Sequence, residues 1–281
     1  MSAAKTSPRA LLERHGLQPK KSFGQNFLTD AELARRIAEL ATTPEGGTVL
    51  ELGAGLGALT LPLLDRASRV IAVERDRDLV PLLATELAPL IEAGRLRVVE
   101  ADAKSVDVKA LFEGTPRPHV LAGNLPYQIT GPLLTLAVES ARCLDRAVFL
   151  LQLEVADRVA AGPGDAAYGA LSVFVQAQFR ARRAFVIKRG AFHPAPNVDS
   201  AVLVLEPLAT PAAQETRAFQ ELVRGAFRQR RKKLRNAWKG VLGKDSETLE
   251  RAATRCGVDL NARGETLSVA AFACMAEELG S

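Results

Sequence analysis

The sequence predicts an α/β protein whose doubly wound, Rossmann-like parallel sheet is followed by a small C-terminal α-helical domain. Strand-like apolar stretches alternate with helical stretches from about residue 30 to about residue 150. A glycine-rich turn follows the first buried strand, as in folds that bind nucleotides at this point. Beyond the prolines at positions 207 and 211 the apolar pattern is helical.

The expected elements follow in chain order. Asp30 is suited to cap a helix that runs to about residue 41. Short apolar runs predict buried strands at 48–50, 70–73, 96–99 and 119–123, with further strands at 179–187 and 201–205. We expect the domain boundary at residues 206–211, which divides the chain into 1–208 and 209–281.

The glycine-rich turn predicts a cofactor site. Residues 51–57 read E-L-G-A-G-L-G, and Gly53 and Gly55 allow a sharp turn and a close backbone approach to a ligand. Glu74 ends the next strand about 20 residues later, the spacing at which an acid reaches a ribose hydroxyl. Asp102 follows the third strand in the same way. These features leave both NAD and S-adenosylmethionine as candidates.

The end of the strand at 119–123 predicts recognition of an amine. The Asn124 side-chain oxygen and the Leu125–Pro126 backbone carbonyl can each accept a hydrogen from an exocyclic amine, while Tyr127 offers a ring face to a base. Proline fixes φ and so helps to hold the carbonyl. An ordinary strand-to-loop turn is the alternative interpretation. The amine-binding pattern, and a loop of the form E-x-G-x-G-x-G instead of G-x-G-x-x-G, favour S-adenosylmethionine over NAD.

Residues 219–238 predict a basic amphipathic helix. Apolar residues recur there at helical spacing, and between residues 224 and 239 there are eight basic residues and no acid. Six of them are candidates for phosphate contacts: Arg224, Arg228, Arg231, Lys232, Arg235 and Lys239. A merely solvated helix face is the alternative. A second basic group at 180–189 is a weaker candidate, since it can simply protect a strand edge.

Composition sets limits on the remaining function classes. The net charge of +5 permits polyanion binding. Three cysteines and three histidines make no cluster, so we expect no metal site and three reduced thiols. No apolar run reaches the length of a membrane span, and the start lacks a signal-peptide core, so we expect a cytoplasmic protein.

Five motifs, in the same order, resemble those of the ribosomal RNA adenine dimethyltransferases: residues 21–28, 51–60, 124–127, 167–173 and 192–201. The resemblance spans roughly residues 15–240 and is closest to the KsgA type, which dimethylates two adjacent adenosines near the 3′ end of small-subunit rRNA. A related type, which methylates large-subunit rRNA, shares most of the motifs. Gln128 stands where the bacterial family often has Asn, and Leu153 where many members have Lys.

The resemblance implies a methyltransferase sheet with an antiparallel final hairpin, S-adenosylmethionine as cofactor, and specific site residues. Residues 1–29 would form a segment that covers the cofactor, and residues 209–281 an rRNA-binding domain, in a protein that we expect to be a monomer. The cofactor would contact Asn26, Leu28, Gly53, Gly55, Glu74, Asp102 and Asn124. Glu74 would bind the ribose and Asp102 the adenine amine of the cofactor. Catalysis would fall to residues 124–127, with the target adenine stacked between Tyr127 and Phe192.

Two other functions remain open from sequence. The chain could be an RNA-binding factor that retains the fold with little catalysis, which the presence of Glu74, Asp102 and residues 124–127 disfavours. A DNA adenine methyltransferase is disfavoured by the motifs at 23–28 and 192–201.

Overall fold

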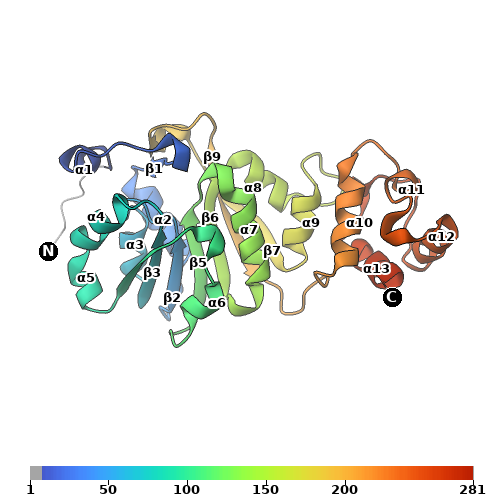
Figure 1. The fold of residues 1–281 in the computed structure, drawn as a ribbon, viewed down its shortest axis with the longest axis horizontal. Coiled ribbons are helices and arrows are strands. Elements are labelled where there is room, and N and C mark those ends of the chain that lie inside the picture. Colours follow the sequence, from blue (N-terminus) through green and yellow to red (C-terminus); the bar gives the residue numbers. More distant parts are fainter. Residues whose placement is uncertain (1–7, 281) are drawn as a thin grey trace. The chain divides into compact units, whose positions relative to one another are not determined.

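The structure is a computed structural model that describes residues 8–280 (Figure 1). The chain divides into two compact units. The first contains the described residues up to Ala156 together with Arg182–Pro207, and the second contains Asp157–Ala181 and the described residues from Leu208 onward. Each unit is described below by itself.

A seven-stranded sheet with the order β4-β3-β2-β5-β6-β9-β7 organises the first unit. The pairs β2–β3, β3–β4, β2–β5 and β5–β6 are parallel, whereas β6 and β9 are antiparallel. This confirms the doubly wound sheet with an antiparallel final strand. The strands are β2 (Thr48–Leu52), β3 (Arg69–Glu74), β4 (Leu96–Glu100), β5 (His119–Asn124), β6 (Arg146–Gln152), β7 (Phe179–Ile187) and β9 (Ser200–Pro207).

Helices flank this sheet (Figure 1). Asp30 caps helix α2 (Ala31–Leu40) as expected, because its side chain accepts hydrogen bonds from the amides of Glu32 and Leu33. The helices are α1 (Pro8–Arg14), α2 (Ala31–Leu40), α3 (Thr60–Leu64), α4 (Leu79–Glu86), α5 (Ala88–Glu92), α6 (Val108–Phe112), α7 (Thr130–Glu139) and α8 (Leu153–Ala160). Single 3-10 turns are η1 (Lys21–Phe23), η2 (Ala103–Ser105), η3 (Tyr127–Ile129), η4 (Ala141–Cys143) and η5 (Arg189–Ala191).

The central strands are buried along their length, which explains why their sequences read as continuous apolar runs. All five residues of β2 are buried, as are residues 120–123 of β5. One core combines strand residues such as Val70 and Val204 with helix residues such as Ile37 and Leu63. This packed core fixes the positions of the strands, and with them the polar residues at the strand ends.

A two-stranded sheet that the sequence did not predict joins two of the motifs. Strand β1 (Phe27–Leu28) pairs antiparallel with β8 (Phe192–His193), with Leu28 opposite Phe192. Phe192 is only 5% exposed and belongs to the core. The N-terminal segment is thus tied to the chain by backbone pairing beside the cofactor motifs.

The second unit is helical and has its own core. This core is built around Trp238, Tyr168, Phe219 and Phe272, all of them at most 1% exposed. Its elements are α9 (Ala170–Gln176), α10 (Arg217–Arg228), α11 (Leu234–Ala237), η6 (Val241–Gly243), α12 (Ser246–Arg255), η7 (Gly264–Thr266) and α13 (Val269–Gly280). Residues 157–181 group with these helices because Tyr168 packs in their core, whereas the sequence-based boundary placed them in the first domain.

The predicted continuous helix over 219–238 is wrong. Helix α10 ends at Arg228, and helical structure resumes only at Leu234. The amides of Leu234 and Arg235 bond to the carbonyls of Ala262 and Leu260, so they cannot continue the hydrogen-bond ladder of α10. The apolar face of α10 nevertheless packs in the core of the second unit as expected.

The expectation of three reduced thiols is also wrong. Cys256, at the end of α12, forms a disulfide with Cys274 of α13, and the two Cα atoms lie 5.7 Å apart. The two helices pack against each other, which brings side chains 18 positions apart into reach. Cys143 is a free thiol.

Candidate active site

A cavity lies at the carboxyl ends of the parallel strands in the first unit. Its lining includes the glycine loop after β2, Glu74 at the end of β3, Asp102 after β4, and Asn124 at the end of β5. In open parallel sheets this edge is where ligands bind. Every cofactor residue expected from the sequence lines the cavity, namely Asn26, Leu28, Gly53, Gly55, Glu74, Asp102 and Asn124.

The glycine loop and Glu74 support each other. Gly53 and Gly55 have φ values of 77° and 57°, in the left-handed region that favours glycine. The Gly55 amide donates a 2.8 Å hydrogen bond to Glu74 Oε2. The amides of Arg75 and Asp76 each donate to Glu74 Oε1, also at 2.8 Å. These bonds fix the carboxylate at the cavity wall. Oε1 already accepts two hydrogen bonds, whereas Oε2 accepts one and keeps a lone pair for a ligand hydroxyl.

Asp102 is held less rigidly. Its Oδ1 accepts from the amide of Lys104, and its Oδ2 lies 3.4 Å from a guanidinium nitrogen of Arg75. That guanidinium also lies 4.7 Å from the ring centroid of Phe23, which comes from the N-terminal segment. Asp102 therefore faces the cavity with one oxygen committed to the backbone and the other beside a cation.

The amide of Asn124 has a defined orientation. Its Nδ2 donates a 2.8 Å hydrogen bond to the backbone carbonyl of Asn26. Because that bond requires the nitrogen, Oδ1 is left as the acceptor on the other branch of the amide. Asn26 is itself fixed, since its own Nδ2 donates to the carbonyl of Gly24 at 3.0 Å. The N-terminal segment thus determines how Asn124 presents its oxygen.

The next two residues provide a second acceptor. Leu125 is 1% exposed, and its amide donates to the carbonyl of Leu150 at 2.9 Å. The Pro126 carbonyl accepts from the Ile129 amide and from Thr130 Oγ1, so it belongs to the following turn. The Leu125 carbonyl, held by the Leu125–Pro126 peptide, is therefore the remaining backbone acceptor of the motif.

The two aromatic residues proposed for stacking differ in position. Tyr127 lines the cavity, and its hydroxyl lies 2.7 Å from Ser200 Oγ. Burial raises the pKa of this phenol, while the hydrogen bond to Ser200 opposes the shift. Phe192 does not line the cavity and packs in the core. The expected pair of rings is therefore not assembled here, because β8 holds the Phe192 ring inward.

Of the two departures from the family pattern, one touches the cavity. Gln128 lines it, and its Nε2 lies 3.4 Å from the carbonyl of Lys21. Leu153 begins α8, and its amide donates to the carbonyl of Asp199. The residue at 128 therefore lies at the cavity, and its effect on contacts near the base stays a prediction.

Sequence reasoning assigned no role to Glu51, although it opens the glycine motif. Glu51 is 1% exposed and lines the cavity, and Thr60 Oγ1 donates to its Oε2 at 2.6 Å. Burial raises the pKa of Glu51 to about 8, the hydrogen bond from Thr60 opposing the shift and the charge of Glu74 adding to it. A carboxyl so placed is largely neutral near pH 7 in the free protein.

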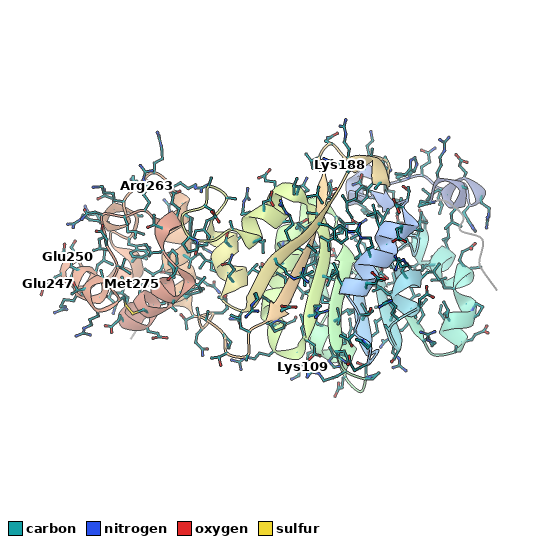
Figure 2. All side chains as sticks on the ribbon, turned by 180° about the vertical axis from the view of Figure 1, so that it is seen from behind. Lys109, Lys188, Glu247, Glu250, Arg263 and Met275 are labelled. Carbon is teal, nitrogen blue, oxygen red and sulfur yellow. A yellow bond between two sulfur atoms is a disulfide. The ribbon has the colours of Figure 1, made fainter. Side chains whose placement is uncertain are left out.

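A basic surface covers part of the second unit. All six of its residues are exposed: Arg224, Arg228, Arg231, Lys232, Arg235 and Lys239. Arg235 pairs with Glu250 of α12 at 3.3 Å (Glu250 is labelled in Figure 2), and Arg224 lies 5.9 Å from the ring centroid of Phe174. Within residues 8–280, Arg228, Arg231, Lys232 and Lys239 have no carboxylate within ion-pair distance. Most of this surface is free to meet phosphate.

The second basic group lies on and after β7, which is an edge strand of the sheet. Arg180, Arg182 and Arg183 are exposed on it. Lys188, labelled in Figure 2, pairs with Asp199 at 2.8 Å. This position agrees with the interpretation that the charges protect a strand edge.

Metal-binding clusters and membrane-spanning helices are both absent from the part of the chain that the structure describes. No cluster of three or more His, Cys, Asp or Glu side chains is placed to hold a metal ion between residues 8 and 280. None of the helices in that range is both long and apolar enough to cross a bilayer.

The sheet order and the cavity define the class of this protein as a Rossmann-like methyltransferase. Residues 16–280 match the family described as Ribosomal RNA adenine dimethylase. The chain is 45% identical to the Ribosomal RNA small subunit methyltransferase A of Anaeromyxobacter sp. (strain K), over 98% of both chains. It is 40% identical to the protein of the same name from Streptococcus pneumoniae (strain ATCC BAA-255 / R6), over 96% of this chain and 95% of that one.

Two solved structures are also similar. A dimethyladenosine transferase from Plasmodium falciparum superposes with a TM-score of 0.72 at 25% identity, covering 89% of this chain and 95% of that one. The 23S rRNA methyltransferase ErmE has a TM-score of 0.67 at 27% identity, with 91% and 100% covered. The chain belongs to the ribosomal RNA adenine dimethylase family. It is an S-adenosylmethionine-dependent enzyme that dimethylates adenine in rRNA.

Proposed function

We propose that this enzyme methylates the exocyclic amines of two adjacent adenosines near the 3′ end of small-subunit rRNA, during ribosome assembly in the cytoplasm, and that it acts as a monomer. Full-length similarity to proteins named for the small subunit supports this choice over the large subunit. The observation that carries the catalytic part of the proposal is the oriented amide of Asn124, whose nitrogen is committed to Asn26.

The cavity fits S-adenosylmethionine by the chemistry of its lining. When bound, this cofactor supplies a methyl group on a sulfonium, which is an excellent leaving group. Glu74 would accept hydrogen bonds from the ribose hydroxyls, and Asp102 would accept one from the cofactor's adenine amine. Gly53 and Gly55 would let the backbone approach the methionine portion, with Leu28, Asn26 and Asn124 closing the site.

Asn124 and the Leu125 carbonyl would catalyse by positioning the target amine. That amine is a poor nucleophile because its lone pair is delocalised into the adenine ring. Two acceptors on its hydrogens favour a pyramidal nitrogen whose lone pair is directed at the methyl group. With the cofactor bound, the nitrogen would bond to the methyl carbon as the sulfur–carbon bond breaks, and the amine proton would pass to water. No nucleophile or base from the chain is needed.

Tyr127 would stack on the adenine once the base has left its helix, since enzymes acting on a base must first expose it. Its bond to Ser200 would keep the ring at the cavity wall. A stacking role for Phe192 remains a prediction, and it requires the ring to move from its packed position.

The basic surface would dock the enzyme on rRNA phosphates, with residues 209–281 as the rRNA-binding domain. Exposed cations without partners support this assignment. Phosphate contacts position a protein without reading sequence. Target choice would then come from the three-dimensional surface of a partly assembled small subunit.

The test is incubation with tritiated S-adenosylmethionine and immature small subunits, followed by mapping of dimethyladenosine. We expect label in two adjacent adenosines near the 3′ end of the rRNA. Label elsewhere in rRNA would refute the proposed target. Binding of subunits without any label would favour the alternative of an assembly factor with little catalysis.

A further inference from the structure

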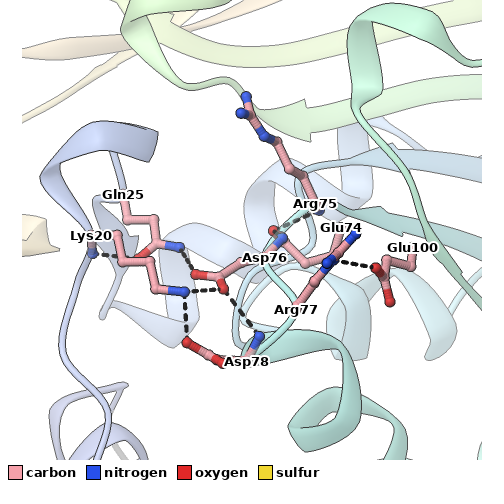
Figure 3. Close-up of polar contacts among 8 residues, drawn as sticks. All are labelled: Lys20, Gln25, Glu74, Arg75, Asp76, Arg77, Asp78 and Glu100. Carbon is pink, nitrogen blue, oxygen red and sulfur yellow. Dashed lines mark hydrogen bonds and ion pairs between the residues drawn. The ribbon is translucent and has the colours of Figure 1, made fainter.

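A buried carboxylate beside the cavity connects the N-terminal segment to the end of β3, and none of the proposed roles uses it. The Asp76 side chain is 2% exposed. Its Oδ1 accepts from Lys20 Nζ and its Oδ2 accepts from Gln25 Nε2 at 2.7 Å, both from the N-terminal segment (Figure 3). The Gln25 side chain is fixed in turn, because its Oε1 accepts from the Lys20 amide at 2.7 Å.

This carboxylate is ionised in the fold. Burial disfavours the charge, but the hydrogen bonds from Lys20, from the Asp78 amide and from Gln25 outweigh burial and lower the pKa of Asp76. A buried charge is tolerated when it is paired and hydrogen-bonded in this way. Removing Lys20 would leave the charge with only neutral partners, which makes Asp76 sensitive to the position of the N-terminal segment.

One end of the network reaches the residue proposed to bind ribose. The backbone amide of Asp76 donates to Glu74 Oε1 at 2.8 Å, so a shift of Asp76 moves a donor of the Glu74 carboxylate. Figure 3 shows Glu74, the last residue of β3, and Asp76 just beyond it, with Gln25 and Lys20 approaching from the other side.

The other end of the network reaches the residue proposed for catalysis. Gln25 immediately precedes Asn26, whose carbonyl accepts the Nδ2 hydrogen of Asn124 at 2.8 Å. Ser22 to Leu28 line the cavity, so the segment held by Asp76 is also its wall. One carboxylate therefore fixes the segment that orients Asn124 and, through its own backbone amide, contacts Glu74 at the end of β3.

We propose that Asp76 is a positioning residue which, with Lys20 and Gln25, latches residues 20–26 over the cofactor cavity. The latch thereby fixes the positions of Glu74 and Asn124 at the cavity wall. This proposal rests on the proposed function for its effect on turnover. Opening the latch weakens cofactor binding through Glu74 and slows methyl transfer through Asn124. It leaves the basic surface, and hence the binding of RNA, unchanged.

The experiment compares Lys20→Met with Lys20→Arg and a matched control, Arg77→Met. Arg77 is 87% exposed, follows Asp76 directly, and pairs with Glu100 at 3.1 Å instead of with the N-terminal segment (Figure 3). Lys20→Met should lower S-adenosylmethionine affinity in calorimetry by about tenfold, the size expected for one charge-assisted hydrogen bond. It should also lower kcat, with subunit affinity unchanged. Lys20→Arg should recover most of both losses, and Arg77→Met should match wild type.

A double-mutant cycle separates a latch from general destabilisation. Asp76→Asn combined with Lys20→Met should be no worse than the more damaged single variant, because each opens the same latch. Hydrogen exchange of residues 20–26 should quicken in every variant that opens it. Additive losses, or exchange that stays at the wild-type rate in Lys20→Met, would overturn the proposal.

Failure of the proposed function would give a different pattern. In that case wild type would leave small subunits unlabelled, while cofactor affinity and hydrogen exchange would still respond to Lys20→Met and not to Arg77→Met. If Lys20→Met and Arg77→Met both behave as wild type in calorimetry and exchange, the latch is refuted whatever RNA the enzyme modifies.

Discussion

Replacing Glu51 by Gln should change how the stability of the free protein depends on pH. Glu51 is 1% exposed and accepts one hydrogen bond, from Thr60 Oγ1 at 2.6 Å. Burial raises the pKa of its carboxyl from an ordinary value of 4.5 to about 8. Gln keeps the size and an acceptor oxygen for Thr60, but it cannot ionise.

The sign follows from the raised pKa. Below pH 4.5 Glu51 is protonated in both the folded and the unfolded chain, so it adds no pH dependence. Between pH 4.5 and about 8 the unfolded chain ionises it and the folded chain does not, so the free energy of unfolding falls as pH rises. At about 1.4 kcal/mol per pH unit, the loss across that interval is on the order of 5 kcal/mol.

The assay is chemical denaturation of wild type and Glu51→Gln at pH 5, 6, 7 and 8 without cofactor. Subtracting the two curves removes the titration of all other groups. The variant should gain stability over wild type as pH rises, by a few kcal/mol at pH 8 relative to pH 5. Glu113→Gln, at an exposed position, is the matched control for the substitution itself. A Glu51→Gln curve parallel to wild type would refute the argument, since it would mean that Glu51 is charged in the fold.

Three further predictions concern the cofactor, the base and the RNA. Glu74→Ala should lower S-adenosylmethionine affinity about tenfold or more, because a charged acceptor is lost at a cost of about 1.5–3 kcal/mol; unchanged affinity in calorimetry would contradict the assignment. Tyr127→Phe should be mild and Tyr127→Ala severe in methylation assays, since stacking contributes about 1–3 kcal/mol per base; equal damage would point to the hydroxyl. Reversing Arg228, Arg231 and Lys232 to Glu should weaken binding to small subunits and leave cofactor affinity unchanged. The plot of log binding constant against log salt concentration should become less steep, by roughly 0.7–0.9 in slope for each phosphate contact that is lost. Normal subunit binding by that triple variant would move the RNA site elsewhere, with the group at 180–189 as the next candidate.

The sheet was predictable because its strands leave a simple signal. Parallel strands covered on both faces are continuous apolar runs, so β2, β3 and β5 were found to within a few residues. The expected strand at 179–187 coincides with β7. Side chains at the ends of such strands must meet at one edge of the sheet, which is why Glu74, Asp102 and Asn124 could be assigned to one site.

What sequence could not predict depends on contacts between distant residues. The pairing of β1 with β8 joins two-residue strands, too short for any periodic signal, and it decides that Phe192 packs inward. The turn after Arg228 arises because the amide of Leu234 bonds to Ala262. Lys20 and Asp76 are, in sequence, two ordinary charges 56 positions apart, and only the fold buries one beside the other.

The central claim is that Asn124 catalyses by accepting a hydrogen from the target amine, and Asn124→Ala tests it most directly. Turnover on immature small subunits should fall by about 100-fold or more, the scale for losing one preorganised polar contact in a transition state. Affinity for the subunits should stay at the wild-type level, because the basic surface is untouched. Asn261→Ala, at an exposed position in the second unit, serves as the matched control and should retain full activity. Near-normal turnover in Asn124→Ala would contradict the account.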